Sequence, residues 1–177
     1  MKNTFNMFIV GMMALALVSC QSGSNPEKDS QAPAAGQQGI LTPVKWSFTV
    51  NKISDTEAEL LMKATIDKGW HLYSMNQDTG TGDNSGPTPL TFEFEKSPNY
   101  SLDGEINEPT PLKANDPVFE MSVKFYEHEA VYKQKIKILT KDPFTVTGFL
   151  NFQSCDDAMC IPPTDEEFKF EIPGSAG

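Results

Sequence analysis

Two cysteines near the C-terminus are the residues best suited to chemistry. Cys155 and Cys160 lie in the segment QSCDDAMCIPP, and the third cysteine, Cys20, is far away near the N-terminus. The alternating residues before Cys155 and the Pro-Pro pair after Cys160 predict a hairpin. A hairpin with this loop places the two Cα atoms within reach of a disulfide. In an exported chain, an oxidising compartment lets such a disulfide persist.

The short loop between these cysteines leaves two uses for the disulfide open. Closing a ring of about six residues restricts the unfolded chain by only about 2 kcal/mol, so the bond is a weak structural staple. A small exposed ring beside prolines is also open to attack by a thiolate. Asp156 and Asp157 disfavour a thiolate, and we expect them to raise the pKa of the Cys155 thiol. If the pair is redox-active, these residues predict a passive relay and not a thioredoxin-like nucleophile.

Other kinds of chemistry find little support in the sequence. His71 and His128 are the only histidines, and neither has the ligand spacing of a zinc site. The acidic, Gly-rich segment 78–89 does not follow a calcium-loop pattern. We expect no metal and no cofactor. The net charge of -10 would repel phosphate backbones, which excludes nucleic-acid binding.

The elements that must position the cysteines are predicted to be β-strands. Apolar and polar residues alternate in short segments separated by Pro and Gly, and there is no long amphipathic helix. The segment 57–66 is the exception, because AELLMKA also fits a helix. The spacing predicts an all-β domain over residues 43–174, an immunoglobulin-like antiparallel β-sandwich of about eight or nine strands. Strands are expected near 45–50, 57–66, 90–95, 100–106, 130–139, 144–153 and 168–172.

The N-terminus predicts export and a lipid anchor. Lys2 precedes an apolar run from Met7 to Val18, which is typical of a signal peptide and short for a membrane-spanning helix. The sequence LVSC resembles a bacterial lipobox, which predicts a signal peptide over 1–19 and a lipid on Cys20. An ordinary signal peptide cut nearby is the alternative. Residues 20–42 are rich in Ser, Gly, Gln, Ala and Pro, as in a flexible tether.

Three stretches of the chain carry a family resemblance. The segment GFLNFQSCDDAMCIPP at 148–163 resembles the cysteine hairpin in the N-terminal periplasmic domain of DsbD, the thiol:disulfide interchange protein. The segment GWHLYS at 69–74 is similar to that domain's aromatic segment beside the active site. The region from Phe125-Tyr126 to Lys133 is similar to its cap loop and following strand. The likeness covers about residues 44–172 and keeps the order of the stretches.

The resemblance implies a role for each of these stretches. Cys155 and Cys160 would be a redox pair, with Cys155 as the site of the mixed disulfide with partners. The pair would take electrons from a thioredoxin-like or DsbD-type membrane protein and pass them to oxidised periplasmic proteins. Four aromatic residues would surround the pair: Phe125 and Tyr126 as cap-loop residues that shield it, and Trp70 and Tyr73 as walls of the site.

The chain also departs from the family pattern. It ends at Gly177 without the membrane domain and the thioredoxin-like domain that continue a DsbD protein, so the resemblance implies a separate electron donor. A lipid on Cys20 would hold the domain, which we expect to be monomeric, close to such a membrane partner. The alternative function is a non-catalytic surface lipoprotein whose sandwich binds a protein or glycan and whose disulfide is purely structural.

Overall fold

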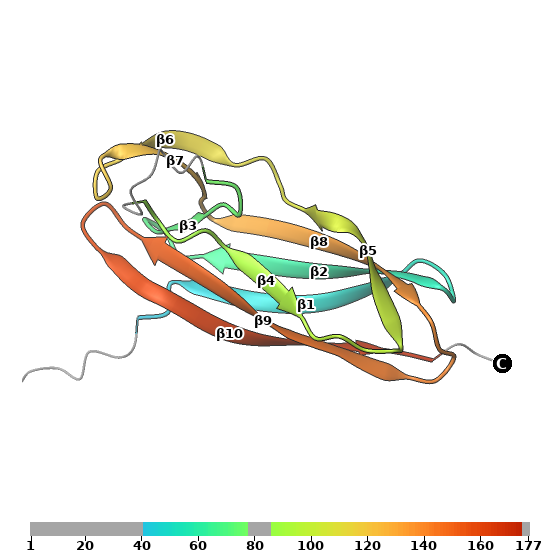
Figure 1. Ribbon diagram of the computed structural model, residues 1–177. Helices are drawn as coiled ribbons and strands as arrows, with labels where there is room; N and C mark the ends of the chain where they lie inside the picture. Colours follow the sequence, from blue (N-terminus) through green and yellow to red (C-terminus); the bar gives the residue numbers. More distant parts are fainter. Residues whose placement is uncertain (1–40, 78–85, 175–177) are drawn as a thin grey trace, which may run out of the picture. The chain divides into compact units, whose positions relative to one another are not determined.

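The computed structural model describes residues 41–77 and 86–174, and these residues form an antiparallel β-sandwich (Figure 1). The predicted all-β, immunoglobulin-like fold is confirmed. Within the described residues, no helix is long and apolar enough to cross a membrane. The strands are β1 (Val44–Lys52), β2 (Glu57–Ile66), β3 (His71–Tyr73), β4 (Thr91–Phe94), β5 (Tyr100–Asn107), β6 (Leu112–Asp116), β7 (Met121–Tyr126), β8 (Glu129–Ile138), β9 (Phe144–Cys155) and β10 (Cys160–Ile172).

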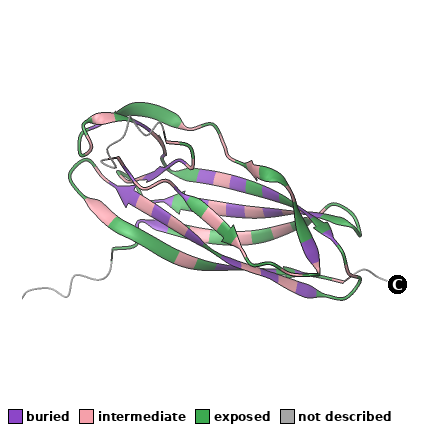
Figure 2. Cartoon of the chain, in the orientation of Figure 1, coloured by how far each residue is buried: buried purple, intermediate pink, exposed green. Residues whose placement is uncertain are grey.

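Two sheets make up the sandwich. One sheet has the strand order β1-β2-β8-β5, and the other has the order β10-β9-β3-β7-β6 with β4 paired to β9. The segment 57–66, whose pattern also fits a helix, is the strand β2 between β1 and β8. Its side chains alternate between buried and more exposed positions, as do those of β8 (Figure 2). This alternation places one face of each strand in the core.

The main core between the sheets is rich in aromatic rings. The ring of Trp46 lies 5.8 Å from the ring centres of both Phe92 and Phe152, and 6.0 Å from that of Tyr132. Edge-to-face and tilted pairs of this kind add stability beyond the area they bury. The core therefore supports the site, which lies at one end of the sandwich.

The long strand β9 connects this core to the cysteine pair. Along one edge, β9 pairs with β10 from Phe144 to Cys155. Along its other edge, it pairs with β4 through residues 148–151 and with β3 through Ser154 and Cys155. Cys155 therefore lies in an interior strand with neighbours on both sides, whereas Cys160 lies in β10, the end strand of the sheet.

The strand β10 is longer than the sequence pattern predicts. The alternating residues predict a start near Phe168, but the strand begins at Cys160 and includes Pro162 and Pro163. The register between β9 and β10 shifts between Ile161 and Thr164, where the prolines lie. Proline is tolerated in an end strand and at a bulge because no ladder hydrogen bond is then required from its nitrogen.

Candidate functional site

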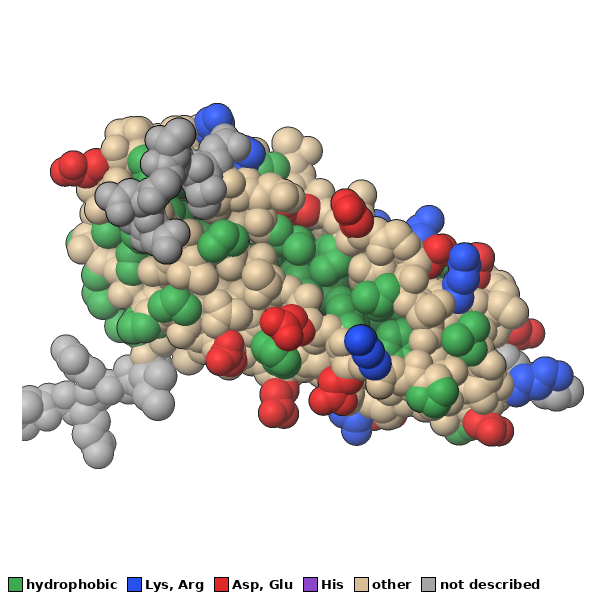
Figure 3. Space-filling model, in the orientation of Figure 1, with side chains coloured by type: hydrophobic (Ala, Val, Ile, Leu, Met, Phe, Trp, Pro, Cys, Tyr) green, Lys and Arg blue, Asp and Glu red, His purple; other side chains and the backbone are tan. Residues whose placement is uncertain are grey.

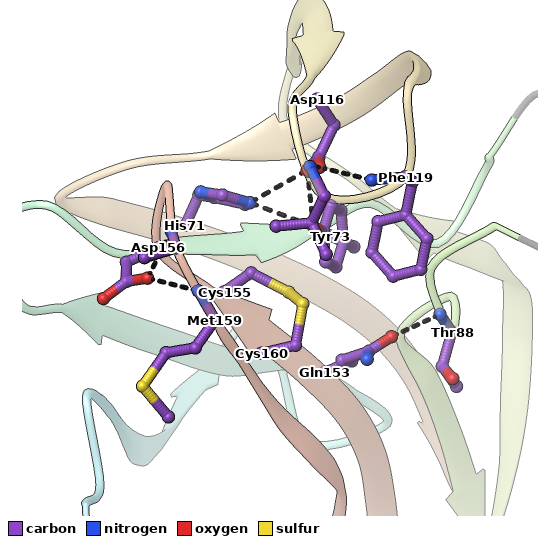
Figure 4. Close-up of a disulfide and its surroundings, with 12 residues drawn as sticks. His71, Tyr73, Thr88, Asp116, Phe119, Gln153, Cys155, Asp156, Met159 and Cys160 are labelled. Carbon is purple, nitrogen blue, oxygen red and sulfur yellow. Dashed lines mark hydrogen bonds and ion pairs between the residues drawn. A yellow bond between two sulfur atoms is a disulfide. The ribbon is translucent and has the colours of Figure 1, made fainter.

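Cys155 and Cys160 form a disulfide across the base of the β9–β10 hairpin (Figure 4). Their Cα atoms are 4.0 Å apart, and the two residues are directly paired in the strand register. The disulfide that the sequence predicts is thus present. Cys155 is fully buried, at 0% exposure, whereas Cys160 is only partly buried.

The turn between the cysteines is held by its first residue. Asp156 Oδ1 accepts hydrogen bonds from the backbone N–H of Ala158 at 2.8 Å and of Met159 at 2.7 Å. The N–H groups of Ala158 and then Met159 are the main causes that lower the pKa of the Asp156 carboxyl. Asp157 is exposed. Their effect on the Cys155 thiol stays a prediction, because the cysteines are joined in a disulfide.

A small apolar cluster, separate from the main core, surrounds the disulfide. Its buried members are Tyr73, Val123 and Cys155. We call it the disulfide cluster, and it is completed by the partly buried residues Phe119, Met121, Phe125 and Cys160. Within this cluster, Cys155 is a buried member, whereas Cys160 is only partly buried.

The aromatic residue that reaches the disulfide from a loop is Phe119. It lies in the turn 117–120 between β6 and β7, and its ring is 5.8 Å from that of Tyr73 in an edge-to-face pair. Figure 4 shows the Phe119 ring beside the two sulfur atoms. We call residues 117–120 the Phe119 turn. Sequence reasoning did not find Phe119, although the Asp116-Pro117 dipeptide before it is a turn signal.

Two expected cap-loop residues lie in a strand instead. Phe125 and Tyr126 belong to β7, so their placement in a loop is wrong. Phe125 still packs against the disulfide cluster, whereas Tyr126 is buried in the main core and its hydroxyl donates to the Pro109 carbonyl at 2.6 Å. The reason is pairing with a strand that is distant in the sequence, because Leu72 and Tyr73 of β3 pair with Tyr126 and Phe125 of β7.

The two expected wall residues are placed differently. Tyr73 is fully buried in the disulfide cluster. Trp70, which precedes β3, packs against the main core. His71 pairs directly with Cys155 in the strand register, so their side chains lie on the same face of the sheet. His71, whose side chain is 12% exposed, therefore belongs to the site, a role that sequence reasoning did not assign to it.

A buried polar network adjoins the disulfide cluster. The Tyr73 hydroxyl donates to Asp116 Oδ2 at 2.6 Å, and His71 Nε2 lies 3.0 Å from the Tyr73 hydroxyl and 3.3 Å from Asp116 Oδ2. Burial first, and then the hydrogen bond to Asp116, raise the pKa of Tyr73 far above its ordinary value. The hydroxyl therefore stays protonated and remains a donor at neutral pH.

The surface around the disulfide carries exposed apolar side chains. Met159 at the hairpin turn is 47% exposed, and Val118 in the Phe119 turn is 41% exposed. On the face shown in Figure 3, charged side chains gather toward the middle and the C-terminal end of the domain. The part near the β9–β10 hairpin is mostly hydrophobic or uncharged on that face.

Some expected features cannot be placed in this structure. The signal peptide, Cys20 and nearly all of the tether lie outside the described residues. Within residues 41–77 and 86–174, there is no group of three or more His, Cys, Asp or Glu side chains arranged to hold a metal ion.

The chain matches a known protein family. Residues 37–172 match the family described as "Thiol:disulfide interchange protein DsbD, N-terminal". This range contains all ten described strands and both cysteines of the disulfide. No curated protein sequence matches the chain.

Several solved structures are similar in fold. The N-terminal periplasmic domain of ScsB from Proteus mirabilis has 18% identity and a TM-score of 0.51, over 75% of this chain and 48% of that one. The reduced N-terminal domain of Neisseria meningitidis DsbD has 18% identity and a TM-score of 0.49, over 77% and 92%. The same domain in complex with the N-terminal domain of PilB has 16% identity and a TM-score of 0.44, over 74% and 87%. At these identities, the likeness to ScsB concerns the fold alone.

Proposed function

We propose, because this chain belongs to the family of DsbD N-terminal domains, that its disulfide relays electrons between periplasmic proteins. At the general level, the family and the Cys155–Cys160 disulfide identify a thiol–disulfide exchange module. The proposed donor is a thioredoxin-like or DsbD-type membrane protein, and the proposed acceptors are oxidised periplasmic proteins. The observation that carries the proposal is a disulfide between one buried and one partly buried cysteine at an apolar end of the domain.

The exchange moves two electrons and two protons in two steps. A thiolate of the donor attacks the Cys160 sulfur, which breaks the disulfide, forms a mixed disulfide and releases Cys155 as a thiolate that takes up a proton. The donor's second thiol, once deprotonated, attacks the donor sulfur of the mixed disulfide. Cys160 then leaves and is protonated, so this domain holds a dithiol and the donor holds a disulfide. The same steps in reverse reduce an acceptor.

The difference in burial supports attack at Cys160. The rate of exchange depends on which sulfur an incoming thiolate can reach. Cys155 is covered by β3, β10 and the disulfide cluster, whereas Cys160 lies in the end strand β10. The sequence resemblance implied the opposite order, with Cys155 forming the mixed disulfide. We propose Cys160 instead, with Cys155 as the leaving and resolving group.

The surroundings of the pair suit a guarded exchange site. We propose that Phe119 shields the disulfide and moves aside when a partner docks, because its ring comes from a turn and is only partly buried. Met159 and Val118 offer exposed apolar contacts on the hairpin turn and the Phe119 turn. A partner surface with apolar side chains around its own cysteine would be complementary to these residues.

Export and lipid anchoring remain part of the proposal. A lipid on Cys20 would keep the domain at a membrane and raise its effective concentration near a membrane-embedded donor. Mass spectrometry of the mature protein tests this directly, because a lipidated Cys20 carries a defined added mass. Cys20→Ala should release the protein into the soluble periplasmic fraction, and retention of that variant in the membrane would contradict the anchor.

Trapping of mixed disulfides tests the proposed function and the order of attack. Cys155→Ala keeps the partly buried Cys160 thiol, and Cys160→Ala keeps the buried Cys155 thiol. After incubation with an oxidised thioredoxin-like protein, Cys155→Ala should form a mixed disulfide at least tenfold faster than Cys160→Ala. A Cys155→Ala/Cys160→Ala variant is the matched control. Trapping by neither single variant would overturn the relay, and faster trapping by Cys160→Ala would overturn only the proposed order.

A further inference from the structure

Asp116, at the end of β6, is a buried carboxylate whose two oxygens contact different parts of the molecule. It is only 3% exposed. Oδ1 accepts hydrogen bonds from the backbone N–H of Val118 at 2.8 Å and of Phe119 at 3.0 Å. Oδ2 accepts from the Tyr73 hydroxyl at 2.6 Å and lies 3.3 Å from His71 Nε2. One side chain therefore joins the Phe119 turn to β3.

The turn itself does not require the contacts that Asp116 Oδ2 makes. An Asp, Asn or Ser at the first position of a turn commonly accepts hydrogen bonds from the next two or three N–H groups, and one oxygen is enough for that. Burying a carboxylate is costly unless it is well paired. The second oxygen of Asp116 reaches β3, where His71 pairs with Cys155 in the strand register. The arrangement thus connects the Phe119 turn to the strand that flanks the buried cysteine.

One residue of the Phe119 turn has a backbone conformation that is unfavourable for its type. Glu120, its last residue, has a φ of 54°, in the left-handed region that residues other than glycine seldom adopt. No glycine occupies the turn, so its observed conformation depends on contacts that compensate for the positive φ of Glu120. The hydrogen bonds to Asp116 and the contact between Phe119 and Tyr73 are the contacts that hold the turn in place.

We propose that Asp116 is a positioning residue that holds the Phe119 turn closed over the cysteine pair and so limits access to Cys160. This inference rests on the proposed exchange function, because it assigns the control of access at the same site. This role requires no contact between Asp116 and the sulfur atoms. It acts by fixing Phe119, and its connection to Tyr73 and His71 fixes it in turn to the strand beside Cys155.

The charge state of Asp116 agrees with this role. Burial alone would raise the pKa of its carboxyl, but the Tyr73 hydroxyl, the N–H groups of Phe119 and Val118, and His71 together lower it. The carboxylate is therefore ionised at neutral pH and accepts strong hydrogen bonds. Asp116→Asn keeps the size of the side chain and one oxygen for the turn, but it removes the charge and the second acceptor.

Alkylation of a single Cys160 thiol tests the inference without relying on redox exchange. In the full chain carrying Cys155→Ala, the rate of reaction of Cys160 with iodoacetamide reports how often the turn opens. Rates are compared on the high-pH plateau, where the thiol is fully ionised, so a change in the thiol pKa does not contribute. We expect Asp116→Asn to accelerate alkylation about tenfold and Phe119→Ala to accelerate it at least as much.

The combination of the two substitutions separates positioning from general stability. Asp116→Asn should add less than twofold in a Phe119→Ala background, because the ring that it positions is gone. Equal acceleration in both backgrounds, or no acceleration in either, would overturn the inference. Tyr73→Phe, which removes the hydroxyl that donates to Oδ2 and contacts His71 but keeps the ring, should give a smaller acceleration and serves if Asp116→Asn fails to fold. If Asp116→Asn has no effect while Cys160 still traps partners, the positioning role fails and the exchange function stands.

Discussion

Removal of the Phe119 ring should expose the disulfide to small thiols. In Phe119→Ala, the pair loses a partly buried aromatic side chain whose burial contributes about 1 kcal/mol, roughly half the value of a fully buried Phe. It also loses the edge-to-face pair with Tyr73, worth about 0.5 to 1.5 kcal/mol. If attack requires this ring to move away, the barrier falls by about 2 kcal/mol, and the rate of reduction rises about thirtyfold.

The assay is the rate of reduction by excess dithiothreitol at neutral pH, followed by quenching with an alkylating reagent and mass spectrometry. Phe149→Ala is the matched control, because Phe149 lies on the same strand as Cys155 but its side chain is 41% exposed. Its rate should stay within twofold of the unmodified protein. A Phe119→Ala rate equally close to that of the unmodified protein would refute the shielding role, provided that circular dichroism shows a folded domain.

Three further predictions concern the network and the fold. Tyr73→Phe removes a hydrogen bond to a charged acceptor and should lower the free energy of unfolding by about 2 kcal/mol, measured with urea. The pKa of Asp116 is lower in the folded state, so the free energy that its carboxylate contributes to folding is complete above about pH 4 and disappears as the pH falls further. In an acid titration, Asp116→Asn should not show this loss of stability. Gly148→Ala should destabilise the domain strongly, because an added Cβ would collide with the Glu93 carbonyl oxygen and the Phe168 ring.

Each of these predictions has a clear contradictory result. Equal urea midpoints for Tyr73→Phe and the unmodified protein would mean that the buried hydroxyl contributes nothing. An acid transition of the same depth in Asp116→Asn would assign the titration to other carboxylates. Normal thermal stability of Gly148→Ala would mean that β4 and the ring of Phe168 can move away from β9 at little cost.

The parts of the fold that the sequence predicts well are those where burial alternates. Strands β2 and β8 have one face in the core, and their alternating residues predict them within one residue at each end. Strand β6 shows no such pattern, because it is an end strand whose residues 112–115 are all exposed. Strand β3 has only three residues, and its last two are both buried, so it carries no alternating signal.

In the candidate site too, some features follow from the local sequence and others do not. The disulfide follows from two cysteines at close spacing beside turn residues, which is local information. The polar network does not, because Tyr73 and Asp116 are 43 positions apart and meet only through the pairing of β3 with β7 and of β7 with β6. The sequence alone places Phe125 and Tyr126 in a loop for a related reason, since their strand pairing is also long-range.

The difference in burial between Cys155 and Cys160 could not be predicted from the sequence either. Both residues belong to one hairpin, and local patterns treat them alike. The order of strands in the sheet distinguishes them, because β9 has neighbours on both edges and β10 is an end strand. The proposal that partners attack Cys160 therefore depends on the sheet topology.

The reduction potential of the Cys155–Cys160 pair tests the central claim most directly. The purified protein is equilibrated with dithiothreitol buffers of defined ratio, and the fraction of dithiol is measured after acid quenching and alkylation. An exchange module should show a potential well above about -300 mV, because structural disulfides in exported proteins typically have potentials below that value. A potential below about -300 mV would contradict the relay and favour a structural disulfide in a binding domain.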